Sequence, residues 1–494
     1  MKRPLVHPIL RAAALNSIGF LLLAGAAAAQ SAKPAAPPVM STVPALLVSD
    51  VHFEPFWDPA KAPQLASAPV GEWKSILAAA PSPDQPQRFA ALQQACHARG
   101  ADTSYALYNA SLKAMRAHGA EIKFVAVGGD LVSHAFQCKY NTLFPNATPE
   151  SYRAFVEKTL NYVVDQLYAA FPGVPVFVAL GNNDSDCGDY RLDAHSEFLS
   201  AVGREVTKDF PASERLSAQA SFASGGYYSI ALPAPIQNAR LLVLDDLFLS
   251  KNYATCAGKA DPAAIDAQIA WLTQQLAAAR AAKEKIWVLG HIPPGVDLHA
   301  TASKMIDVCG GHSPVMFLSS EKLADTLTGS ADVVELALFA HTHMDEIKLL
   351  RDESQSPAPA KSVAVKLIPS ISPINGNRPA FIVAQLDPSS AALVDYKLFA
   401  ASNSTGLDAL WSEEYDFAHS YREPEFTSST ITQLIAKLTA DPEAKTQASQ
   451  NYIGDFSTGQ LSSILTLFWP QYVCSMANHS PQSFRSCVCP VPKE

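Results

Sequence analysis

The sequence predicts an α/β (α+β) fold, a layered domain of α/β or αββα type followed by a small helical, disulfide-tied C-terminal subdomain. Three observations predict it. Short apolar runs alternate with longer amphipathic stretches, which is the pattern of strands and helices in a layered domain. Of the 494 residues, 48% are hydrophobic and 17% are charged, so the chain can bury a large core. Past Thr405 the strand pattern stops, helical stretches take over, and three cysteines gather near the end.

Residues 1–29 are predicted to be a secretory signal peptide. They start with basic residues, continue through the almost wholly apolar run 12–28, and offer small residues for cleavage at 27–29. An uncleaved membrane anchor is the alternative, but polar residues interrupt the run, which favours cleavage. A Pro/Ala spacer follows at residues 30–42. We therefore expect a secreted or periplasmic protein that has no transmembrane segment after signal cleavage.

The main domain is predicted over residues 43–400. Its candidate strands are Val43–Ser49, Ile122–Val127, Val174–Leu180, Tyr227–Leu232, Arg240–Leu244, Lys285–Leu289, Glu335–Phe339, Ser362–Ile368, Phe381–Leu386 and Leu393–Phe399. Its candidate helices are Thr103–His118, Pro149–Ala170 and Asp261–Lys283. The proline-rich segment Glu54–Gln87 is expected to be irregular, with one short helix near Trp73.

The remaining residues, 401–494, form the predicted C-terminal subdomain, with candidate helices at Ser428–Ala440 and Ser457–Leu467. The whole chain has eight cysteines, an even number, and a predicted export signal, so we expect disulfides. Their pairing cannot be deduced from sequence. A cysteine-based zinc site is the alternative, but the spacing Cys487-x-Cys489 is not the usual one and no second such pair exists.

The net charge of the chain is −9 at pH 7, and no run of Lys or Arg occurs. Binding to a phosphate backbone depends on clustered positive charge. We therefore expect no nucleic-acid scaffold as a partner.

Five short motifs follow predicted strands, each at the carboxyl end of its strand. They are Ser49-Asp50-Val51-His52, Gly128-Gly129-Asp130 with His134 four residues later, Gly181-Asn182-Asn183-Asp184, Gly290-His291, and His341-Thr342-His343. Residues two apart on an extended backbone point the same way, so Asp50 and His52 can converge, as can His341 and His343. Each motif alone is explained as well by a turn or a structural histidine. Because layered α/β domains hold their sites at this edge, the five together predict a metal site.

Read in order, the motifs resemble the calcineurin-like metallophosphoesterase superfamily, whose signature is D-x-H, G-D, G-N-x-D/E, G-H and G-H-x-H. The stretches GHIPPG, FAHTHMDE, PSISPINGNRPAF and QIAWLTQQL are similar to the acid sphingomyelinase-like phosphodiesterases of that superfamily. The resemblance covers about residues 43–398, and the cysteine-bearing helical tail is also similar to that subgroup.

The resemblance implies a four-layer αββα sandwich and two divalent metal ions. One would be held by Asp50, His52 and His343, and the other by Asn182, His291 and His341. Asp130 would bridge both. A hydroxide shared by the ions would then attack phosphorus, so we expect hydrolysis of phosphodiester or phosphoanhydride bonds. Four histidines with carboxylate and amide oxygens, and no thiolate, favour Zn, with Mn or Fe as alternatives.

The chain departs from the family pattern at two positions. Ala340 stands where the last motif usually has glycine, a small change. Asn183 stands where the family usually has histidine, the residue assigned to transition-state contact and proton donation. Asn183 can donate a hydrogen bond to a phosphoryl oxygen but no proton. His134 is the candidate replacement for the acid, because a histidine four residues after the bridging aspartate recurs in the subgroup.

Substrate class stays open at this point. The wording G-N-N-D with LDDLFLSKNY downstream also resembles endopolyphosphatases of the same lineage, so polyphosphate or nucleotides compete with a lipid headgroup as the phosphate-containing substrate. A metal-retaining, catalytically silent binding protein is the alternative of another class. Peripheral membrane contact would need an exposed apolar patch; Phe53, Phe56 and Trp57 are candidates, although we expect them to be buried. Asp345 and Glu346 are candidates for orienting His343 or His291, but we expect them to be solvated.

Overall fold

A computed structural model describes residues 42–353, 361–459 and 462–489. The predicted signal peptide, residues 1–29, and the predicted spacer up to residue 41 lie outside the described residues.

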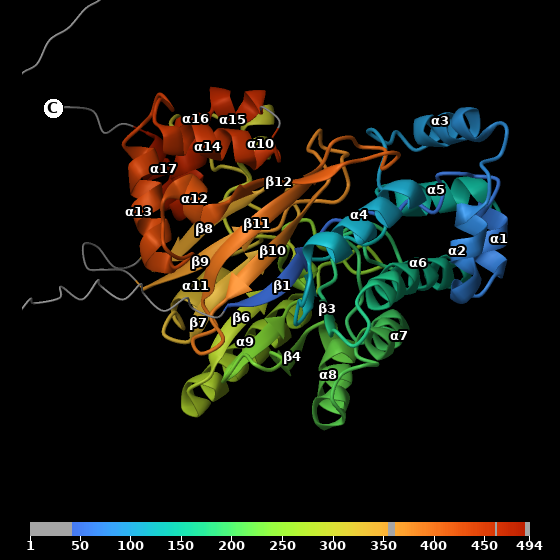
Figure 1. Cartoon of the computed structure of the whole chain (residues 1–494), viewed down its shortest axis with the longest axis horizontal. Helices are drawn as coiled ribbons and strands as arrows, with labels where there is room; N and C mark the ends of the chain where they lie inside the picture. The colour runs from blue at the N-terminus through green and yellow to red at the C-terminus, as the bar shows by residue number, and fades with distance from the viewer. Residues whose placement is uncertain (1–41, 354–360, 460–461, 490–494) are drawn as a thin grey trace, which may run out of the picture. The chain divides into compact units, whose positions relative to one another are not determined.

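Two six-stranded sheets form the centre of the fold (Figure 1). The first has the strand order β12 (Trp411–Asp416), β11 (Leu393–Ala401), β10 (Ala380–Leu386), β1 (Val43–Val48), β2 (Val125–Val127) and β3 (Val176–Val178). The second has the order β4 (Tyr228–Ala231), β5 (Ala239–Val243), β6 (Lys285–Leu289), β7 (Val334–Phe339), β9 (Ser362–Leu367) and β8 (Glu346–Arg351).

Parallel pairing brings the carboxyl ends of several strands to one edge of each sheet. In the first sheet β1 is parallel to β2 and β2 to β3. In the second sheet β5, β6, β7 and β9 are parallel in that order. The strands that precede the five sequence motifs, β1, β2, β3, β6 and β7, are all among these.

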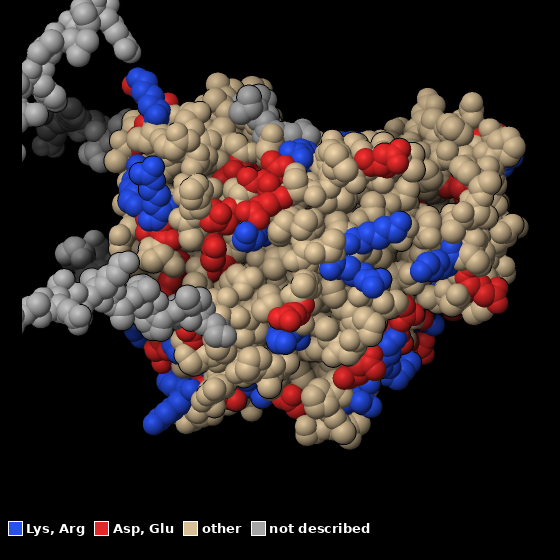
Figure 2. Space-filling model, viewed as in Figure 1, with Lys and Arg blue, Asp and Glu red and all other residues tan. Residues whose placement is uncertain are grey.

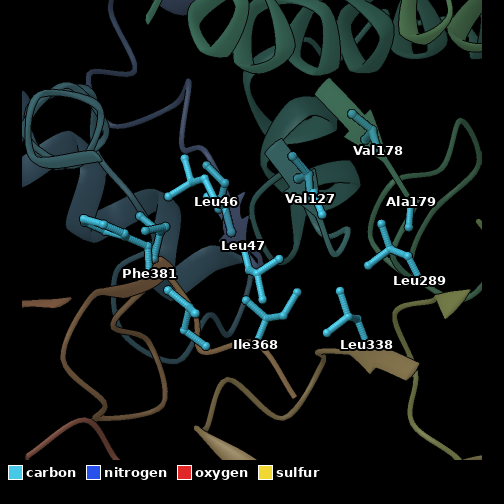
Figure 3. Packing of buried hydrophobic residues seen from close by; sticks show 14 of the residues in the cluster. Leu46, Leu47, Val127, Val178, Ala179, Leu289, Leu338, Ile368 and Phe381 are labelled. Atoms are coloured by element: carbon cyan, nitrogen blue, oxygen red, sulfur yellow. The ribbon is translucent and has the colours of Figure 1, made fainter. Parts of the chain in front are cut away.

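The two sheets pack face to face over one apolar core. Leu47, Val127 and Val178 of the first sheet point towards Leu289 and Leu338 of the second, and all five are buried (Figure 3). Alternating side chains of the strands supply this layer, because successive residues of a strand point to opposite faces.

Helices cover the outer face of each sheet. On the first sheet these include α4 (Tyr105–His118), α6 (Pro149–Ala170) and α7 (Glu197–Val206) (Figure 1). A second apolar core joins the other sheet to α9 (Pro262–Ala282) and α11 (Lys322–Thr328), with Leu272, Leu276 and Leu327 packing on Val288 and Val365. Two sheets flanked by helices confirm the predicted αββα layering. Further helices of this part are α5 (Phe136–Leu143), α8 (Ala212–Gly225), α10 (Leu298–Ser303) and the 3₁₀ helix Asp246–Leu249.

The C-terminal part is mainly helical and packs on the second sheet. Its helices are α12 (Phe417–Tyr421), α13 (Ser428–Thr439), α14 (Gln447–Phe456), α15 (Ser463–Leu467), α16 (Trp469–Ala477) and α17 (Pro481–Val488). Among these, α13 and α16 lie against β8 (Figure 1). The prediction that strands stop after Thr405 is wrong, because β12 adds a strand to the first sheet. This edge strand carries charged residues, and its pairing with β11 decides its conformation.

The segment Glu54–Gln87 differs from its predicted irregular conformation. It contains α1 (Ala62–Ser67), α2 (Val70–Ala78), which includes Trp73, and the start of α3 (Gln85–Ala95). Three of its prolines lie where helices begin: Pro63 and Pro86 occupy the first turns of α1 and α3, and Pro69 is the N-cap of α2. Proline is tolerated in a first turn because the N–H that it lacks would have no partner inside the helix.

All eight cysteines are paired, and no free cysteine occurs in the part of the chain that the structure describes. The disulfides are Cys96–Cys138, Cys187–Cys256, Cys309–Cys489 and Cys474–Cys487. The first ties α3 to α5, and the third joins the loop after α10 to the C-terminal end. The alternative of a zinc site at Cys487 and Cys489 is therefore wrong.

The helices and the surface charge bear on whether this protein binds membranes or nucleic acid. Within the described ranges, no helix is both long and apolar enough to cross a membrane. On the face shown in Figure 2, Lys and Arg side chains lie in small groups among Asp and Glu, and the described residues there form no continuous basic stripe.

The disulfides give a stability prediction. Cys309–Cys489 spans 180 residues and Cys474–Cys487 spans 13, so removing the first releases more unfolded-state entropy. We expect Cys309→Ser/Cys489→Ser to lower the free energy of unfolding by about 5 kcal/mol, and Cys474→Ser/Cys487→Ser by about 3 kcal/mol. Urea unfolding followed by circular dichroism measures both. Equal losses would show that loop entropy does not set the contribution of these bonds.

Candidate metal centre

The seven side chains predicted as metal ligands lie together where strands of both sheets end. Asp50 and His52 follow β1, Asp130 follows β2, Asn182 follows β3, His291 follows β6, and His341 and His343 follow β7. All are buried except His341, which is partly exposed. The structure thus brings residues from both sheets to one place.

One group of side chains surrounds Asp50. The Nε2 atom of His343 lies 3.4 Å from Asp50 Oδ1 and 3.2 Å from His52 Nε2. His52 Nε2 lies 3.4 Å from Asp130 Oδ2. Ligand atoms of Asp50, His52 and Asp130 all lie within 4.8 Å of one another, as a single metal ion requires.

A second group lies on the other side of Asp130. The Nε2 atom of His291 is 3.2 Å from Asp130 Oδ2 and 3.2 Å from Asn182 Oδ1. Ligand atoms of Asp130, His291 and His341 lie within 4.8 Å of one another. Asp130 therefore belongs to both groups.

Hydrogen bonds from outside the cluster orient the ligands. The Nδ1 atom of His52 lies 2.9 Å from the backbone carbonyl oxygen of Val132. The Nδ1 atom of His291 lies 2.7 Å from the backbone carbonyl oxygen of Gly128. If each Nδ1 carries the proton and donates it, Nε2 presents its lone pair to the cluster. Asn182 Nδ2 donates to Asp189 Oδ1 at 2.8 Å, which turns its Oδ1 towards His291.

The loops after the strands adopt an unusual backbone. Five predicted ligands have positive φ: Asp50, His52, Asp130, His341 and His343. Such angles are uncommon for residues other than glycine and gather at functional sites. Gly181 shows how close the loops lie, since a Cβ atom there would be 2.2 Å from Asp130 Oδ1.

Buried carboxylates and polar atoms without hydrogen-bond partners make this place suitable for cations. Neither carboxylate oxygen of Asp50 has a hydrogen-bond partner although both are buried, and the same holds for His343 Nδ1. Burial disfavours a charged imidazole, yet the carboxylates of Asp130 and Asp50 raise the pKa of His52 to about 9. Burial likewise opposes charge on His291, and Asp130 above all raises its pKa to about 10. The carboxylates hold protons on these two rings, and divalent cations would take over that positive charge.

The remaining two histidines of the cluster are neutral. Burial lowers the pKa of His343 to about 3 and that of His341 to about 4. A neutral imidazole has a free nitrogen lone pair, which a metal ligand needs. The donor set of imidazole, carboxylate and amide, together with the unpartnered oxygens, therefore fits transition-metal ions.

His134, the predicted acid, borders the cluster and is 34% exposed. Its ring stacks on that of His52 with centroids 3.9 Å apart. Its Nδ1 lies 3.0 Å from Asp102 Oδ1, and its backbone N–H donates to Asp102 Oδ2 at 2.8 Å. The Ser372 hydroxyl donates to Asp102 Oδ1 at 2.8 Å.

Asn183 is buried beside Asp130. Its backbone N–H donates to Asp130 Oδ1 at 2.8 Å, and its Nδ2 donates to Asp130 Oδ2 at 2.9 Å. Two donors to one carboxylate fix the orientation of Asp130.

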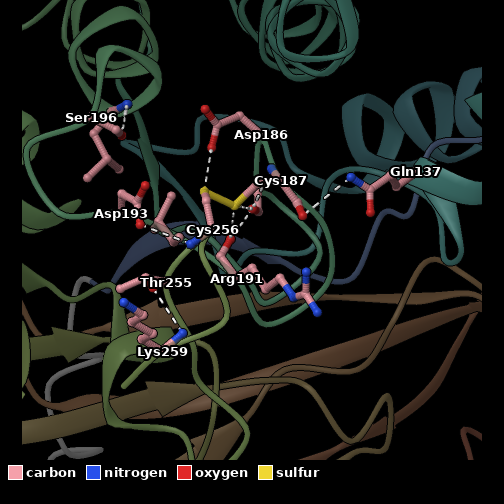
Figure 4. The surroundings of a disulfide bond; sticks show 12 residues. Gln137, Asp186, Cys187, Arg191, Asp193, Ser196, Thr255, Cys256 and Lys259 are labelled. Atoms are coloured by element: carbon pink, nitrogen blue, oxygen red, sulfur yellow. Dashed lines mark hydrogen bonds between the residues drawn. A yellow bond between two sulfur atoms is a disulfide. The ribbon is translucent and has the colours of Figure 1, made fainter. Parts of the chain in front are cut away.

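Sequence reasoning missed Asp102, Asp189 and Tyr190. The Tyr190 hydroxyl lies 3.2 Å from His341 Nε2. Asp189 and Tyr190 lie in the loop after β3, and the disulfide Cys187–Cys256 fixes this loop to the segment around Thr255. Figure 4 shows the surroundings of this disulfide. No motif marks these three residues, because their contacts are made by folding; only an aligned set of relatives could have pointed to them.

Asp345 and Glu346 are buried, so the prediction that they are solvated is wrong. Asp345 forms an ion pair with the buried Lys366 and accepts a hydrogen bond from the Tyr415 hydroxyl. Glu346 lies 3.7 Å from Lys348. Their partners are thus lysine and tyrosine residues. The C-terminal helices α13 and α16 pack on β8 and cover this part of it.

Comparisons with known proteins agree with this geometry. The model of the calcineurin-like phosphoesterase family matches residues 43–345. The chain is 25% identical over 408 residues to acid sphingomyelinase-like phosphodiesterase 3b of Mus musculus, covering 80% of this chain and 79% of that protein. It is 26% identical over 349 residues to the cyclic GMP-AMP phosphodiesterase SMPDL3A of Homo sapiens, covering 68% and 70%.

Among solved structures, the chain resembles a dimetal phosphatase from Danio rerio, with 13% identity over 75% of this chain and 98% of that one and a TM-score of 0.39. The family model spans well over half of the chain and takes in all five motifs. The chain therefore belongs to the calcineurin-like phosphoesterase family, hydrolases that act on phosphoester bonds.

Proposed function

We propose that this protein is a binuclear, metal-dependent phosphodiesterase similar to the acid sphingomyelinase-like enzymes. The observation that carries the proposal is the buried carboxylate of Asp130, which lies 3.2 Å from His291 Nε2 and 3.4 Å from His52 Nε2 and so belongs to both ligand groups. The names of the relatives, which include phosphodiesterases of two kinds, support a diester as substrate.

Two divalent cations, with Zn preferred over Mn or Fe from the donor set, would occupy the centre. Asp50, His52 and His343 would hold one ion, and Asn182, His291 and His341 the other, with Asp130 between them. Bound there, the ions would activate a water molecule near neutral pH and stabilise charge on phosphoryl oxygens. The chain's own residues orient the ligands and supply the proton.

His134 is proposed to donate the proton to the leaving group. Asp102 accepts at Nδ1, which keeps that nitrogen protonated and leaves Nε2 to exchange a proton with substrate. Burial opposes ionisation of Asp102, but His134 holds the pKa of Asp102 well below its usual value, so Asp102 is an ionised acceptor for the Nδ1–H of His134.

Asn183 is proposed as the second catalytic residue. Its side-chain amide has two N–H groups, and one of them is used on Asp130. The other can donate to a phosphoryl oxygen held at the centre. An amide cannot give up a proton at neutral pH, so Asn183 would stabilise charge while His134 acts as the acid.

Three alternatives follow from the sequence. Endopolyphosphatase or nucleotide phosphohydrolase activity would use the same ligands on a phosphoanhydride. A metal-retaining protein without activity would bind the ions and hydrolyse nothing. A lipid substrate at a membrane surface is the third. Phe53 and Phe56 are fully buried as expected, but Trp57 is partly exposed, so of these three aromatics Trp57 alone could contribute to an exposed apolar patch.

Export to an oxidising compartment is proposed together with the activity. Four disulfides within the described residues support it, since such bonds persist in extracellular and periplasmic proteins. The predicted signal peptide, residues 1–29, would direct the chain there.

The test of the proposed function is a parallel assay of the metal-loaded protein on a nucleoside phosphodiester, sphingomyelin vesicles, ATP and polyphosphate. Hydrolysis of the diester in preference to the anhydrides supports the proposal. Preferential cleavage of polyphosphate would favour the endopolyphosphatase alternative, and bound metal without any hydrolysis would favour the silent binding protein.

Metal content gives a prediction independent of activity. We expect about two transition-metal ions per purified chain, as in other binuclear sites. Asp130→Asn should bind less than one ion, because it removes the shared negative charge, whereas Asp50→Asn should retain about one. Elemental mass spectrometry measures this. Asp266→Asn, on an exposed side chain, is the control and should keep both ions. Full metal content in Asp130→Asn would contradict the shared ligand.

The acid gives a prediction on leaving groups. His134→Ala should lower kcat by about 10²–10⁴-fold on a diester with a poor alkoxide leaving group. The loss should be much smaller on a diester that releases p-nitrophenolate, because this leaving group needs no proton. Asp102→Asn should lower kcat about 10–100-fold, again more for the poor leaving group, because Asp102 orients the His134 ring.

Steady-state kinetics on the two substrates measures the ratio, and His97→Ala, on an exposed side chain, is the control. Equal losses on both leaving groups in His134→Ala would show that His134 does not act as the acid.

A further inference from the structure

A cavity of 490 Å³ opens beside the proposed metal centre and has no assigned role. His341 and Thr342 are among its lining residues, and the C-terminal helices α14 and α16 contribute Phe456 and Tyr472. The backbone N–H of Asp345 donates to Phe456 O at 2.9 Å, which fixes the end of α14 to the loop that carries His341 and His343. The cavity is thus joined both to the centre and to the C-terminal part, and its volume suits a small organic ligand.

The walls of the cavity are aromatic and apolar over much of their surface. The Phe317 ring lies 5.8 Å from the His341 ring at 81°, and the rings of Phe456 and Tyr472 meet edge to face at 5.4 Å. Met344 adds a thioether that accepts a hydrogen bond from the Ser457 hydroxyl at 3.6 Å. Such walls bind flat rings and compact aliphatic groups by burying their apolar surface.

The charges in the cavity disfavour anions. Among the described lining residues, Asp297 and Glu346 carry carboxylates, and Lys348 is the cation of fixed charge. Lys348 is buried and lies 3.7 Å from Glu346 Oε2, so its charge is already compensated. Asp297 accepts a hydrogen bond from the Ala300 N–H at the start of α10 and adds a further negative charge. A phosphate bound in the cavity away from the proposed metal ions would therefore meet more negative than positive charge from these side chains.

The position of the proposed acid decides which part of a substrate enters. His134 stacks on His52 and does not line the cavity, whereas His341 does. The leaving group must reach His134, so the group in the cavity is the one that stays on phosphorus. This step rests on the proposed function.

We propose that the cavity binds the retained substituent of a phosphodiester, a compact organic group that is uncharged or cationic and no larger than a nucleoside. Glu346 and Asp297 exclude a substituent that carries further phosphates. The same charges select against polyphosphate, which would place anionic units in this space.

The test uses chromogenic substrates that share one leaving group and differ only in the retained part. Water cleaves the P–O bond to p-nitrophenolate in p-nitrophenyl phosphate, in thymidine 5′-(p-nitrophenyl phosphate), and in the same nucleoside ester with an added 3′-phosphate. We expect kcat/KM to be at least about 100-fold higher for the nucleoside ester than for the monoester. The 3′-phosphate should lower it at least about tenfold.

Variants of the charged lining residues Glu346 and Lys348 test whether these charges select against a phosphate on the retained group. Glu346→Gln frees the charge of Lys348, so the penalty for the 3′-phosphate should shrink at least about threefold. Lys348→Met leaves the carboxylates uncompensated, so the same penalty should grow. An unchanged penalty in both variants would overturn the role of these charges.

A variant at an exposed lining residue tests the inference without changing the buried pair Glu346 and Lys348, and it remains available if the variants of that pair do not fold. Asn375 lines the cavity on an exposed loop, so Asn375→Trp should narrow the mouth. It should weaken binding of thymidine 5′-phosphate to the metal-loaded protein at least about tenfold by calorimetry. Asn146→Trp, exposed and outside the cavity, is the matched control and should bind as the unmodified protein does.

The outcomes separate this inference from the proposed function. If the metal-loaded protein hydrolyses none of the three esters, the proposed function fails. If it hydrolyses them without preference, and Asn375→Trp binds thymidine 5′-phosphate normally, the proposed function stands and the role of the cavity is wrong.

Discussion

The buried negative charge of Asp130 is the constraint on which the rest of the site depends. Burial opposes its ionisation, yet the imidazoles of His291 and His52 hold its pKa well below the usual value. An ionised carboxylate inside a protein is costly unless positive charge and hydrogen-bond donors surround it. The two sheets meet this requirement together, since His52 comes from the first and His291 from the second. The pairing of the sheets and the assembly of the ligands are therefore one structural problem.

The loops that carry the proposed ligands are held by a second set of buried carboxylates. Asp184 accepts hydrogen bonds from the backbone N–H groups of Gly181, Leu131 and Val132, and so joins the loop after β3 to the loop after β2. Asp246 accepts from the N–H groups of His291 and Ile292 after β6. These bonds satisfy backbone donors that turn away from any strand, and they offset the strain of positive φ at the ligands.

The C-terminal part is connected to the same site. Lys366, Asp345 and the Tyr415 hydroxyl form a buried network between β9, the loop before β8 and β12. The ammonium of Lys366 also lies 4.9 Å from the centre of the Tyr396 ring. Breaking one partner of such a network leaves an unpaired buried charge, so β12 and the helices that follow are fixed relative to His343. The cavity beside His341 acquires its far wall in this way.

The sequence by itself determined the layered fold, the main strands and the set of candidate ligands, because apolar periodicity and polar residues at strand ends are local properties of the chain. It did not determine β12, the helices of the segment Glu54–Gln87, the disulfide pairing, or the partners of Asp102 and Asp345. Each of these depends on contacts between residues far apart in sequence. Asp102 and His134 meet only because two separate loops pack together, and Asp345 is buried only because α14 and β12 cover it. Tertiary structure decides such contacts, since the energy of a buried charge depends on neighbours that no local pattern contains.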